Sequence, residues 1–302
     1  MRRKLLLDTD IGSDIDDAVC LAYVLAQPDC ELLGITTVTG EPERRAMLAS
    51  ALCRVAGKEV PIYPGSELPL LVTQRQPAAP QASALSRWEH QTIFPKRQAI
   101  EFLRRIIHEN PGEVDLLTIG PLTNIALLFK LDPEVPSLLR SLVSMCGYFG
   151  SRSGDGPGPE WNASLDPHAT AIVYRSQARV HRSVGLDMTR QVTLTREQVA
   201  AEFQTPLLQP VYEFAQVWFE KKSLMTLHDP LAATTLFDDG ICEFERGTVE
   251  IELTADRSPG TTYWSPGGQP AWHEVAVSVH RGRFFEHLFG ILHRATSPER
   301  KR

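Results

Sequence analysis

The chain has 302 residues, of which 42% are hydrophobic and 23% are charged, so it can bury a large core. Its formal net charge of -6 argues against a strongly basic nucleic-acid-binding surface, because neutralising phosphates requires clustered Lys and Arg. The apolar run from Leu5 to Leu7 is too short for a signal peptide or a membrane span. We therefore expect a cytoplasmic protein that binds a small molecule, with no nucleic-acid or membrane partner.

Apolar runs of strand length alternate with segments of helical spacing along most of the chain. The pattern predicts a strand at residues 4–8, then a loop and a helix, a strand at 31–40, and a helix closed by Gly57. Further helices are predicted at residues 98–112, 121–133, 168–176 and 195–222, with strands at 60–66, 114–120, 141–147, 178–189 and 249–255. This alternation predicts an α/β fold with an open, mostly parallel, Rossmann-like sheet and helices on both faces. We expect one domain over residues 1–302.

Residues 66–97 interrupt this alternation with a segment rich in Pro, Ala, Gln and Ser. A loop of this length inside a compact domain is usually a functional lid or a disordered excursion. We expect it to be mobile or to close over a site.

Polar segments follow directly after four predicted strands. They are DTDIGSDIDD at residues 8–17, TGEP, IGPLTN, and MCGYFG with the later PEWN. In mostly parallel sheets, ligands bind beyond the carboxyl ends of the strands. These segments are therefore expected to line one rim of the sheet.

The first segment carries five carboxylates in ten residues, Asp8, Asp10, Asp14, Asp16 and Asp17. Such a run repels itself unless a cation or protons neutralise it, and a hard divalent metal is the natural partner. In the alternative reading, Asp8 and Asp17 cap the following helix while the others are solvated. The spacing does not match an EF-hand, so a metal site must recruit ligands from elsewhere in the chain.

Two later polar segments are candidates for the same site. His228 and Asp229 form a compact pair before an apolar helical stretch, although Asp229 followed by Pro230 is also an ordinary helix start. Glu160 and Asn162 are separated by one residue, so in an extended loop both side chains could face one pocket. Taken alone, that segment reads as an ordinary polar loop.

Together, these motifs resemble the nucleoside hydrolase family of the inosine/uridine-preferring type. LLDTDIGSDIDDA, ITTVTG, IGPLTNIA, PEWNASLDPHA and HDPLA occur in the family's order along nearly the whole chain. The resemblance implies the nucleoside hydrolase fold, a tightly held Ca²⁺, and hydrolysis of the N-glycosidic bond of ribonucleosides to ribose and free base. It also implies a homodimer or homotetramer.

The resemblance further implies a role for each residue of the metal site. Asp10 is the counterpart of the metal ligand that is also the general base, and Asp17 and Asp229 complete the carboxylate shell. The main-chain carbonyl of Ile119 is the counterpart of a further Ca²⁺ ligand. Asp16 is the counterpart of the residue that binds the ribose 2′-hydroxyl.

Four more residues gain roles in the same way. Glu160 and Asn162 would bind the 5′ and 3′ hydroxyls, and Met145 would line the sugar pocket. His228 is at the position of the family's leaving-group acid, and a His can carry a proton near neutral pH. Ca²⁺ would orient water and the ribose diol while Asp10 removes the proton.

Three features depart from the family pattern. Glu41 stands where the family often has Asn; it could alter contacts to the sugar or be an ordinary helix-start residue. The aspartate loop is two residues longer than the shortest family form, which leaves Asp14 as a rival to Asp16. Residues 66–97 lack an HGxxG-type segment, and Trp88 and His90 there could contact a base or belong to an ordinary surface loop.

The sequence leaves alternatives open for the base-binding residues and for the class of reaction. Trp218, Phe219 and Trp264 are aromatic candidates by region only, and core packing explains aromatics more often. A haloacid dehalogenase-type phosphohydrolase is a second possibility, since DTD follows an apolar strand, but it fits the HDP element poorly. A third is a ribosyl-binding relative, or one that hydrolyses a non-standard ribosyl substrate. The base preference stays open.

Overall fold

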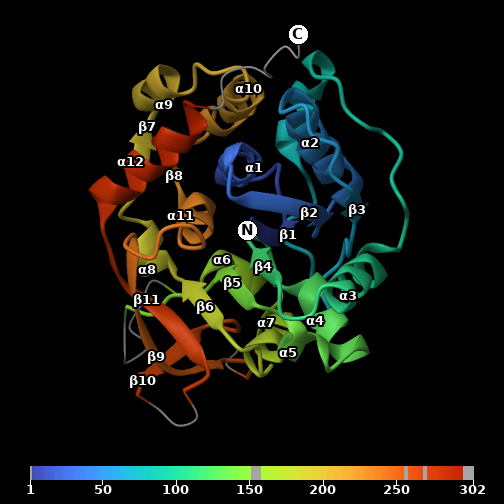
Figure 1. Cartoon of the computed structure of the whole chain (residues 1–302), viewed down its shortest axis with the longest axis vertical. Coiled ribbons are helices and arrows are strands. Elements are labelled where there is room, and N and C mark those ends of the chain that lie inside the picture. The colour runs from blue at the N-terminus through green and yellow to red at the C-terminus, as the bar shows by residue number, and fades with distance from the viewer. Residues whose placement is uncertain (1, 151–157, 255–257, 268–270, 295–302) are drawn as a thin grey trace.

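The computed structural model describes residues 2–150, 158–254, 258–267 and 271–294, and over these residues its centre is a nine-stranded sheet (Figure 1). Its strands are β1 (Arg3–Thr9), β2 (Cys30–Thr37), β3 (Ile62–Pro64), β4 (Val114–Thr118), β5 (Ser141–Met145), β6 (His181–Val184), β9 (Cys242–Ile251), β10 (Thr262–Pro266) and β11 (His273–Val279). They lie in the order β10-β9-β11-β6-β5-β4-β1-β2-β3. The pairings from β11 to β3 are parallel, and β9 runs antiparallel to β11 and β10. The predicted mostly parallel α/β sheet is thus confirmed.

Helices cover both faces of the sheet, as Figure 1 shows. One face packs against α1 (Asp16–Ala26), α2 (Pro42–Val55), α10 (Leu208–Phe219), α11 (His228–Thr234) and α12 (Arg281–Leu292). The other face packs against α3 (Ala99–Glu109), α4 (Thr123–Leu131), α5 (Val135–Leu138) and α7 (Pro167–Tyr174). The remaining elements are η1 (Pro80–Arg87), α6 (Trp161–Leu165), α8 (Leu186–Thr189), β7 (Thr193–Thr195), α9 (Arg196–Glu202) and β8 (Leu224–Thr226).

The first strand shows why the chain forms two cores. Leu5 and Leu7 belong to the cluster on one face, and Leu6 belongs to the cluster on the other. Successive side chains of a strand point to opposite faces, so an unbroken apolar run is what a strand buried on both sides requires. All three side chains are fully buried.

The predicted helix at residues 195–222 is instead two helices. The chain breaks after α9, before Pro206, and α10 begins at Leu208. Proline lacks an amide hydrogen and disfavours helical backbone at the residue before it, which accounts for the break. α9 itself starts with a capping box between Thr195 and Gln198.

The parallel strands place their carboxyl ends along one rim. In the register of the sheet, Asp8 on β1 pairs with Thr36 on β2 and with Thr118 on β4. Thr118 pairs in turn with Ser144 on β5. The segments that leave β1, β2, β4 and β5 therefore emerge side by side, as the sequence predicted.

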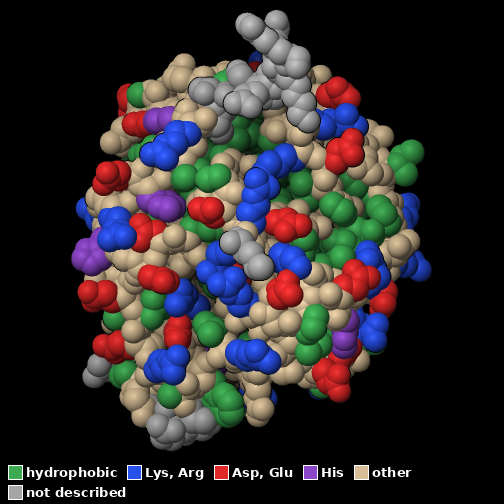
Figure 2. All heavy atoms as spheres, viewed as in Figure 1, with side chains coloured by type: hydrophobic (Ala, Val, Ile, Leu, Met, Phe, Trp, Pro, Cys, Tyr) green, Lys and Arg blue, Asp and Glu red, His purple; other side chains and the backbone are tan. Residues whose placement is uncertain are grey.

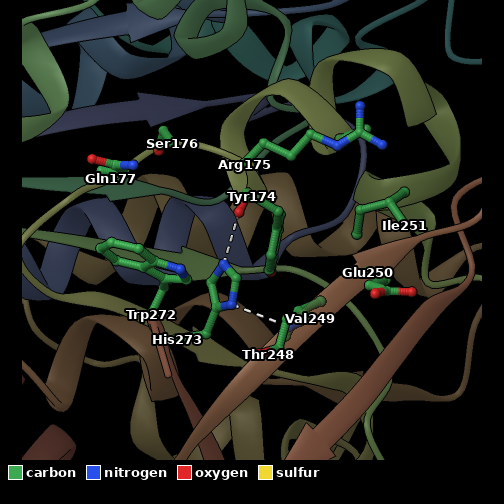
Figure 3. Close-up of a pocket in the computed structure, with 11 residues that line it drawn as sticks. Tyr174, Arg175, Ser176, Gln177, Thr248, Val249, Glu250, Ile251, Trp272 and His273 are labelled. Atoms are coloured by element: carbon green, nitrogen blue, oxygen red, sulfur yellow. Dashed lines mark hydrogen bonds between the residues drawn. The ribbon is translucent and has the colours of Figure 1, made fainter. Parts of the chain in front are cut away.

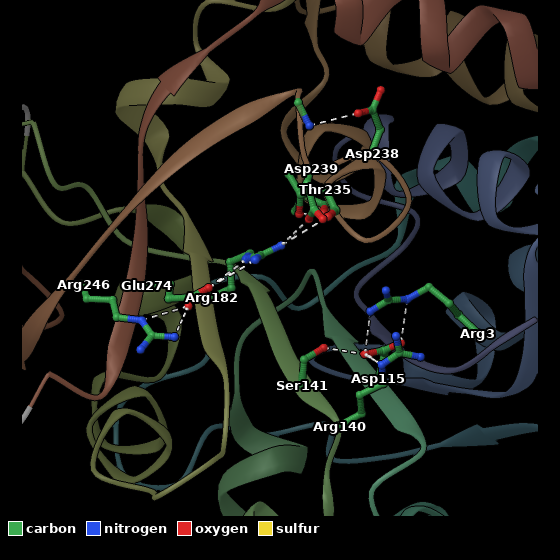
Figure 4. A network of polar contacts seen from close by, with 12 residues as sticks. Arg3, Asp115, Arg140, Ser141, Arg182, Thr235, Asp238, Asp239, Arg246 and Glu274 are labelled. Carbon is green, nitrogen blue, oxygen red and sulfur yellow. Dashed lines mark hydrogen bonds and ion pairs between the residues drawn. The ribbon is translucent and has the colours of Figure 1, made fainter.

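The opposite ends of the strands carry compensated charges (Figure 4). Asp115 at the start of β4 is fully buried, and it accepts two hydrogen bonds from the Arg3 guanidinium at 2.9 and 3.0 Å. Glu274 on β11 forms ion pairs with Arg182 at 3.2 Å and with Arg246 at 3.0 Å. Asp115 and Glu274 thus form ion pairs, whereas the aspartates of the 8–17 run form none within the described residues.

Basic and acidic side chains are interspersed over the face of the molecule in Figure 2. They do not gather into one basic area on that face. Of the helices in the described part of the chain, none combines the length and the apolar character needed to cross a bilayer.

Candidate functional site

A cavity of about 650 Å³ lies at the carboxyl-end rim of the sheet. It is lined by every residue that the sequence assigned to the site: Asp10, Asp16, Asp17, Ile119, Met145, Glu160, Asn162, His228 and Asp229. Asp10 directly follows β1, Ile119 directly follows β4, and Met145 ends β5. The parallel sheet and the packing of α11 thus bring residues from both halves of the chain to one place.

Three carboxylates form the tightest part of this cavity. Each of Asp16, Asp17 and Asp229 offers an oxygen, and these oxygens lie within 4.8 Å of one another. Asp16 and Asp17 begin α1, and the backbone N–H of Asp229 on α11 donates to Asp16 Oδ2 at 2.9 Å. The Thr9 hydroxyl donates to Asp17 Oδ1 at 2.5 Å. One contact between α11 and α1 and one between β1 and α1 therefore hold the cluster together.

The raised pKa values of the clustered carboxylates indicate that a bound cation would stabilise them. Burial, followed by repulsion among the carboxylates, raises the pKa of Asp16, Asp17 and Asp229 well above the usual range. Burial also raises the pKa of Asp10, although the nearby Arg45 opposes this shift. Carboxylate and carbonyl oxygens are the ligands that hard divalent cations prefer, and Ile119 lines the same cavity, where its carbonyl accepts from Asn162 Nδ2. The donor set therefore fits such an ion.

The tight cluster differs from the set of ligands expected from the resemblance. It contains Asp16, which was expected to bind ribose, and it omits Asp10, which was expected to be a ligand. Asp10 lies beside Gly120, where an added Cβ would come within 2.8 Å of Asp10 Oδ1. The loop after β4 thus needs glycine to leave room for this carboxylate.

Two further aspartates of the run take different positions. Asp8 lies fully buried on β1, where Oδ1 accepts hydrogen bonds from Thr36 at 2.5 Å and Asn124 at 2.7 Å, and it does not line the cavity. Asp14 does line the cavity, and burial raises its pKa to about 7. The residue before α1 is Ile15, and no side chain caps that helix. The alternative in which Asp8 and Asp17 act as caps is therefore wrong.

Glu160 and Asn162 are buried and firmly held. The Glu160 carboxylate caps α6 by accepting from the backbone N–H groups of Asn162 at 2.7 Å and Ala163 at 3.0 Å. Burial raises its pKa to about 7. Asn162 Nδ2 donates to the carbonyls of Ile119 and Met145, both at 3.1 Å. The segment is thus a helix start that joins the ends of two strands, β4 and β5, and not an ordinary loop.

The protonation state of His228 differs from the one expected from the sequence. It is the first residue of α11, and its Nδ1 lies 2.6 Å from the Thr189 hydroxyl. Burial, with a contribution from the charge of Arg190, lowers the pKa of His228 to about 4. In the free protein His228 is therefore neutral at pH 7. The resemblance implied instead a residue that carries a proton near neutral pH. If Thr189 donates to Nδ1, the hydrogen lies on Nε2 and can be donated to a ligand.

Several residues that line the cavity were not predicted from the sequence. They are Gln76 from the 66–97 segment, Trp161, Leu186, Arg190, Trp218 and Lys222. Trp218 was a candidate by region only, and Trp161 lies between the two assigned residues of PEWN. The others carry no local motif that distinguishes them from surface residues.

Other aromatic candidates lie outside the cavity. Phe219 and Trp264 are buried in the two cores. Trp88 Nε1 donates to Glu213 on α10 at 3.1 Å, and His90 Nδ1 lies 2.7 Å from the Trp88 carbonyl. Trp88 and His90 are thus anchoring residues of the 66–97 segment rather than parts of the site.

Glu41 also lies outside the cavity. It precedes α2 with a left-handed backbone (φ 57°), and its side chain makes no cap. Instead, Glu41 Oε2 accepts from the backbone N–H of Ala79 at 2.9 Å. Glu41 therefore holds the 66–97 segment in place.

A second cavity of about 480 Å³ lies between the end of α7 and β9 and β11 (Figure 3). His273 lies at its wall, where Nδ1 accepts from the Val249 N–H at 3.1 Å and Nε2 lies 2.8 Å from the Tyr174 carbonyl. Both ring nitrogens thus bind the backbone, so this His has no nitrogen left for chemistry.

Comparison with known proteins identifies the family. The family model for inosine-uridine preferring nucleoside hydrolase matches residues 5–286. The non-specific ribonucleoside hydrolase RihC of Escherichia coli is 31% identical, covering 97% of this chain and 99% of that protein. The inosine-uridine preferring nucleoside hydrolase of Leishmania major is 30% identical, covering 99% and 100%.

A solved structure shows the same fold. The purine-preferring ribonucleoside hydrolase from Gardnerella vaginalis matches with a TM-score of 0.84 at 23% identity, covering 97% of this chain and 99% of that one. The family match leaves no place for the haloacid dehalogenase-type alternative. From the match over residues 5–286 and these relatives, we conclude that the chain belongs to the inosine-uridine preferring nucleoside hydrolase family.

Proposed function

We propose that this nucleoside hydrolase cleaves the N-glycosidic bond of ribonucleosides to ribose and free base, with Ca²⁺ bound at its aspartate cluster. One observation carries the proposal. Buried carboxylates from the first loop and from α11 converge in one cavity with Glu160, Asn162 and His228. The carboxylates of such a cluster repel one another unless a cation binds or protons neutralise them.

The ion would be held by Asp10, Asp17, Asp229 and the carbonyl of Ile119, with Asp16 in the same cluster facing the ribose 2′-hydroxyl. All of these ligands are oxygens, which suits Ca²⁺ better than a softer metal. When bound, the ion offsets the repulsion among the carboxylates and lowers the pKa of water beside it.

The protein residues would carry the remaining steps. Hydrolysis forms a bond between the water oxygen and C1′ of ribose, and it breaks the bond from C1′ to the base nitrogen, whose electron pair leaves with the base. Asp10 takes the proton from the water. Glu160 and Asn162 orient the sugar, and the surrounding carboxylates favour the positive charge that develops on it.

A direct test is the release of reducing sugar from inosine, uridine, adenosine and cytidine, with and without a chelator. We expect release from at least one nucleoside and loss of that release when the metal is removed. No release from any of the four by the metal-loaded protein would overturn the proposal.

His228→Ala is expected to lower kcat for inosine or uridine by about 10²-fold, because the departing base loses a hydrogen-bond donor. A p-nitrophenyl riboside needs no such help, so its kcat should fall much less. Steady-state kinetics on both substrates measure this difference. His90→Ala, which changes a His of the 66–97 segment outside the cavity, is the control and should match the wild type.

Equal losses on both substrates would remove the leaving-group role of His228. The pH profile adds a second check. Because burial lowers the pKa of His228 to about 4, kcat/KM of the free enzyme should show no decline near pH 6.5 from loss of a His228 proton.

Glu41→Gln is expected to change kcat and KM by no more than about twofold, since the amide can still accept from the Ala79 N–H. Steady-state kinetics on inosine and uridine test this. A loss of a hundredfold would instead give Glu41 a direct part in the reaction.

A further inference from the structure

We infer that Gln76, in the 66–97 segment, is a positioning residue that holds the Asp10 carboxylate in its working orientation. Its Nε2 donates a hydrogen bond to Asp10 Oδ2, and its Oε1 accepts from the Trp161 indole N–H at 2.5 Å. The inference rests on the proposed role of Asp10 as the base. It gives the 66–97 segment a role in the reaction, because Gln76 belongs to that segment.

The two hydrogen bonds determine which way the Gln76 amide faces. An indole nitrogen can only donate, so the amide oxygen must face Trp161. An ionised carboxylate can only accept, so the amide nitrogen must face Asp10. A glutamine satisfies both neighbours at once, whereas a glutamate satisfies Trp161 and repels Asp10.

Asp10 needs such a partner because several other carboxylates lie in the same cavity, while Arg45 donates to the Asp10 backbone carbonyl. Asp16, Asp17 and Asp229 lie in the same cavity, and repulsion from them favours turning the Asp10 side chain away. A donor on Oδ2 opposes that rotation and leaves Oδ1 available for a proton. Misplacing a reacting group by about 1 Å can cost about 10²-fold in rate.

Gln76 is itself well fixed. Its side chain is buried, and its backbone N–H donates to Gln74 Oε1 at 2.7 Å. The next residue, Pro77, packs so closely on Gly40 that a Cβ there would lie 2.4 Å from Pro77. The segment therefore cannot shift at this point without losing its contact with the loop after β2.

A buried arginine ties the same segment to the aspartate loop. Arg45 on α2 donates to the carbonyls of Asp10 and Ile11 and, through Nη2, to the Ala78 carbonyl at 3.0 Å. Arg45 is fully buried, so its donors need these acceptors. Asp10 is thus held through its backbone by Arg45 and through its side chain by Gln76.

Trp161, which donates to Gln76, belongs to the segment that is proposed to bind ribose. Trp161 lies between Glu160 and Asn162, and the Arg75 guanidinium lies 5.2 Å from the centre of its ring. Arg75 also donates to the Ser164 carbonyl at 2.6 Å. The position of the base is therefore coupled to that of the residues proposed to bind the sugar.

The test compares Gln76→Glu and Gln76→Met with the wild type, using the Ca²⁺-loaded full chain and inosine, uridine and p-nitrophenyl riboside. We expect kcat to fall by about 10²-fold while KM changes by less than about threefold, because the base is misplaced and sugar binding is kept. Gln91→Glu makes the same chemical change at an exposed position of the same segment and should match the wild type.

A double-mutant cycle separates positioning from a general structural effect. In the Asp10→Asn background, Gln76→Met should lower the remaining activity on the activated riboside by no more than about twofold, because Gln76 acts through Asp10. Trp161→Phe keeps the aromatic ring but removes the indole donor, and it should lower kcat in the same direction as Gln76→Met. The melting temperatures of Gln76→Met and Trp161→Phe, with and without Ca²⁺, should stay close to that of the wild type, and the double variant should stay close to Asp10→Asn.

Three results would overturn the inference. A raised KM with unchanged kcat would mean that Gln76 contacts substrate directly. Losses from Gln76→Met and Asp10→Asn that multiply would mean that the two act independently. Wild-type kinetics in both Gln76 variants would also remove the role. By contrast, a wild-type protein inactive on every ribonucleoside would refute the proposed function itself.

Discussion

Asp10→Asn is expected to lower kcat for ribonucleosides by about 10³-fold while the protein still folds, because the amide cannot accept a proton from water. Asp10 is the carboxylate that leaves β1 at the rim of the sheet, and Arg45 and Gln76 hold it at the cavity wall. The amide has nearly the same shape, so contacts to the sugar should persist and KM should change little. Steady-state kinetics with saturating Ca²⁺ measure the effect.

The same substitution has a second signature in stability. Burial raises the pKa of Asp10, which means that its charged form is unfavourable in the metal-free fold. Asp10→Asn removes that charge, so the metal-free variant should melt at a higher temperature than the metal-free wild type. Its gain on adding Ca²⁺ should be smaller, because one ligand is weakened.

Asp115→Asn is the matched control for both readouts. Asp115 is also a fully buried carboxylate, but it is paired with Arg3 at the opposite end of the strands. Removing its charge leaves the Arg3 guanidinium without its counter-charge, so the melting temperature should fall while kcat is unchanged. Near wild-type kcat in Asp10→Asn would show that another group deprotonates the water.

Removing the metal is expected to abolish activity and to destabilise the protein. At a free Ca²⁺ concentration of about 100 times Kd, binding should add about 2.7 kcal/mol, which for 302 residues corresponds to a rise in melting temperature of roughly 4 °C. Thermal unfolding and activity assays after chelation, followed by re-addition of Ca²⁺, measure both effects. Mg²⁺ at the same concentration is the control, because its smaller octahedral shell suits this carboxylate set less well.

The stability of the metal-free protein should depend on pH in a definite direction. Burial raises the pKa of Asp8, Asp14 and Glu160 to about 7, above the value near 4 in an unfolded chain. The folded state then holds more protons, so the free energy of unfolding falls as pH rises from about 4 to about 7. Below pH 4 this contribution no longer changes, because these groups are protonated in both states.

Calcium should reverse that trend. Its ligands must be deprotonated, so binding strengthens as the carboxylates lose protons over the same pH interval. The rise in melting temperature caused by Ca²⁺ should therefore be larger at pH 8 than at pH 5. A rise that is equal at both pH values, or activity that survives exhaustive chelation, would contradict a metal held by this cluster.

The sequence by itself determined the sheet and the neighbourhood of the site. The run Leu5 to Leu7 demands a strand buried on both faces, and the alternation of strands and helices demands parallel pairing. Parallel pairing then places Asp10, Ile119 and Met145 at one rim, because each stands at or directly after the carboxyl end of a strand. These conclusions depend on periodicity and chain direction, which are local properties of a sequence.

Only the tertiary structure decided which side chains touch. Gln76 carries no motif, yet packing of the 66–97 segment brings it onto Asp10, while Trp88 from the same segment packs against the core and donates to Glu213. The docking of α11 on α1 places Asp229 against Asp16, and the burial that results leaves His228 neutral. Contacts between distant segments and the loss of water around buried charges arise only when the chain is folded, so a local motif can name Asp229 and His228 but not what they contact.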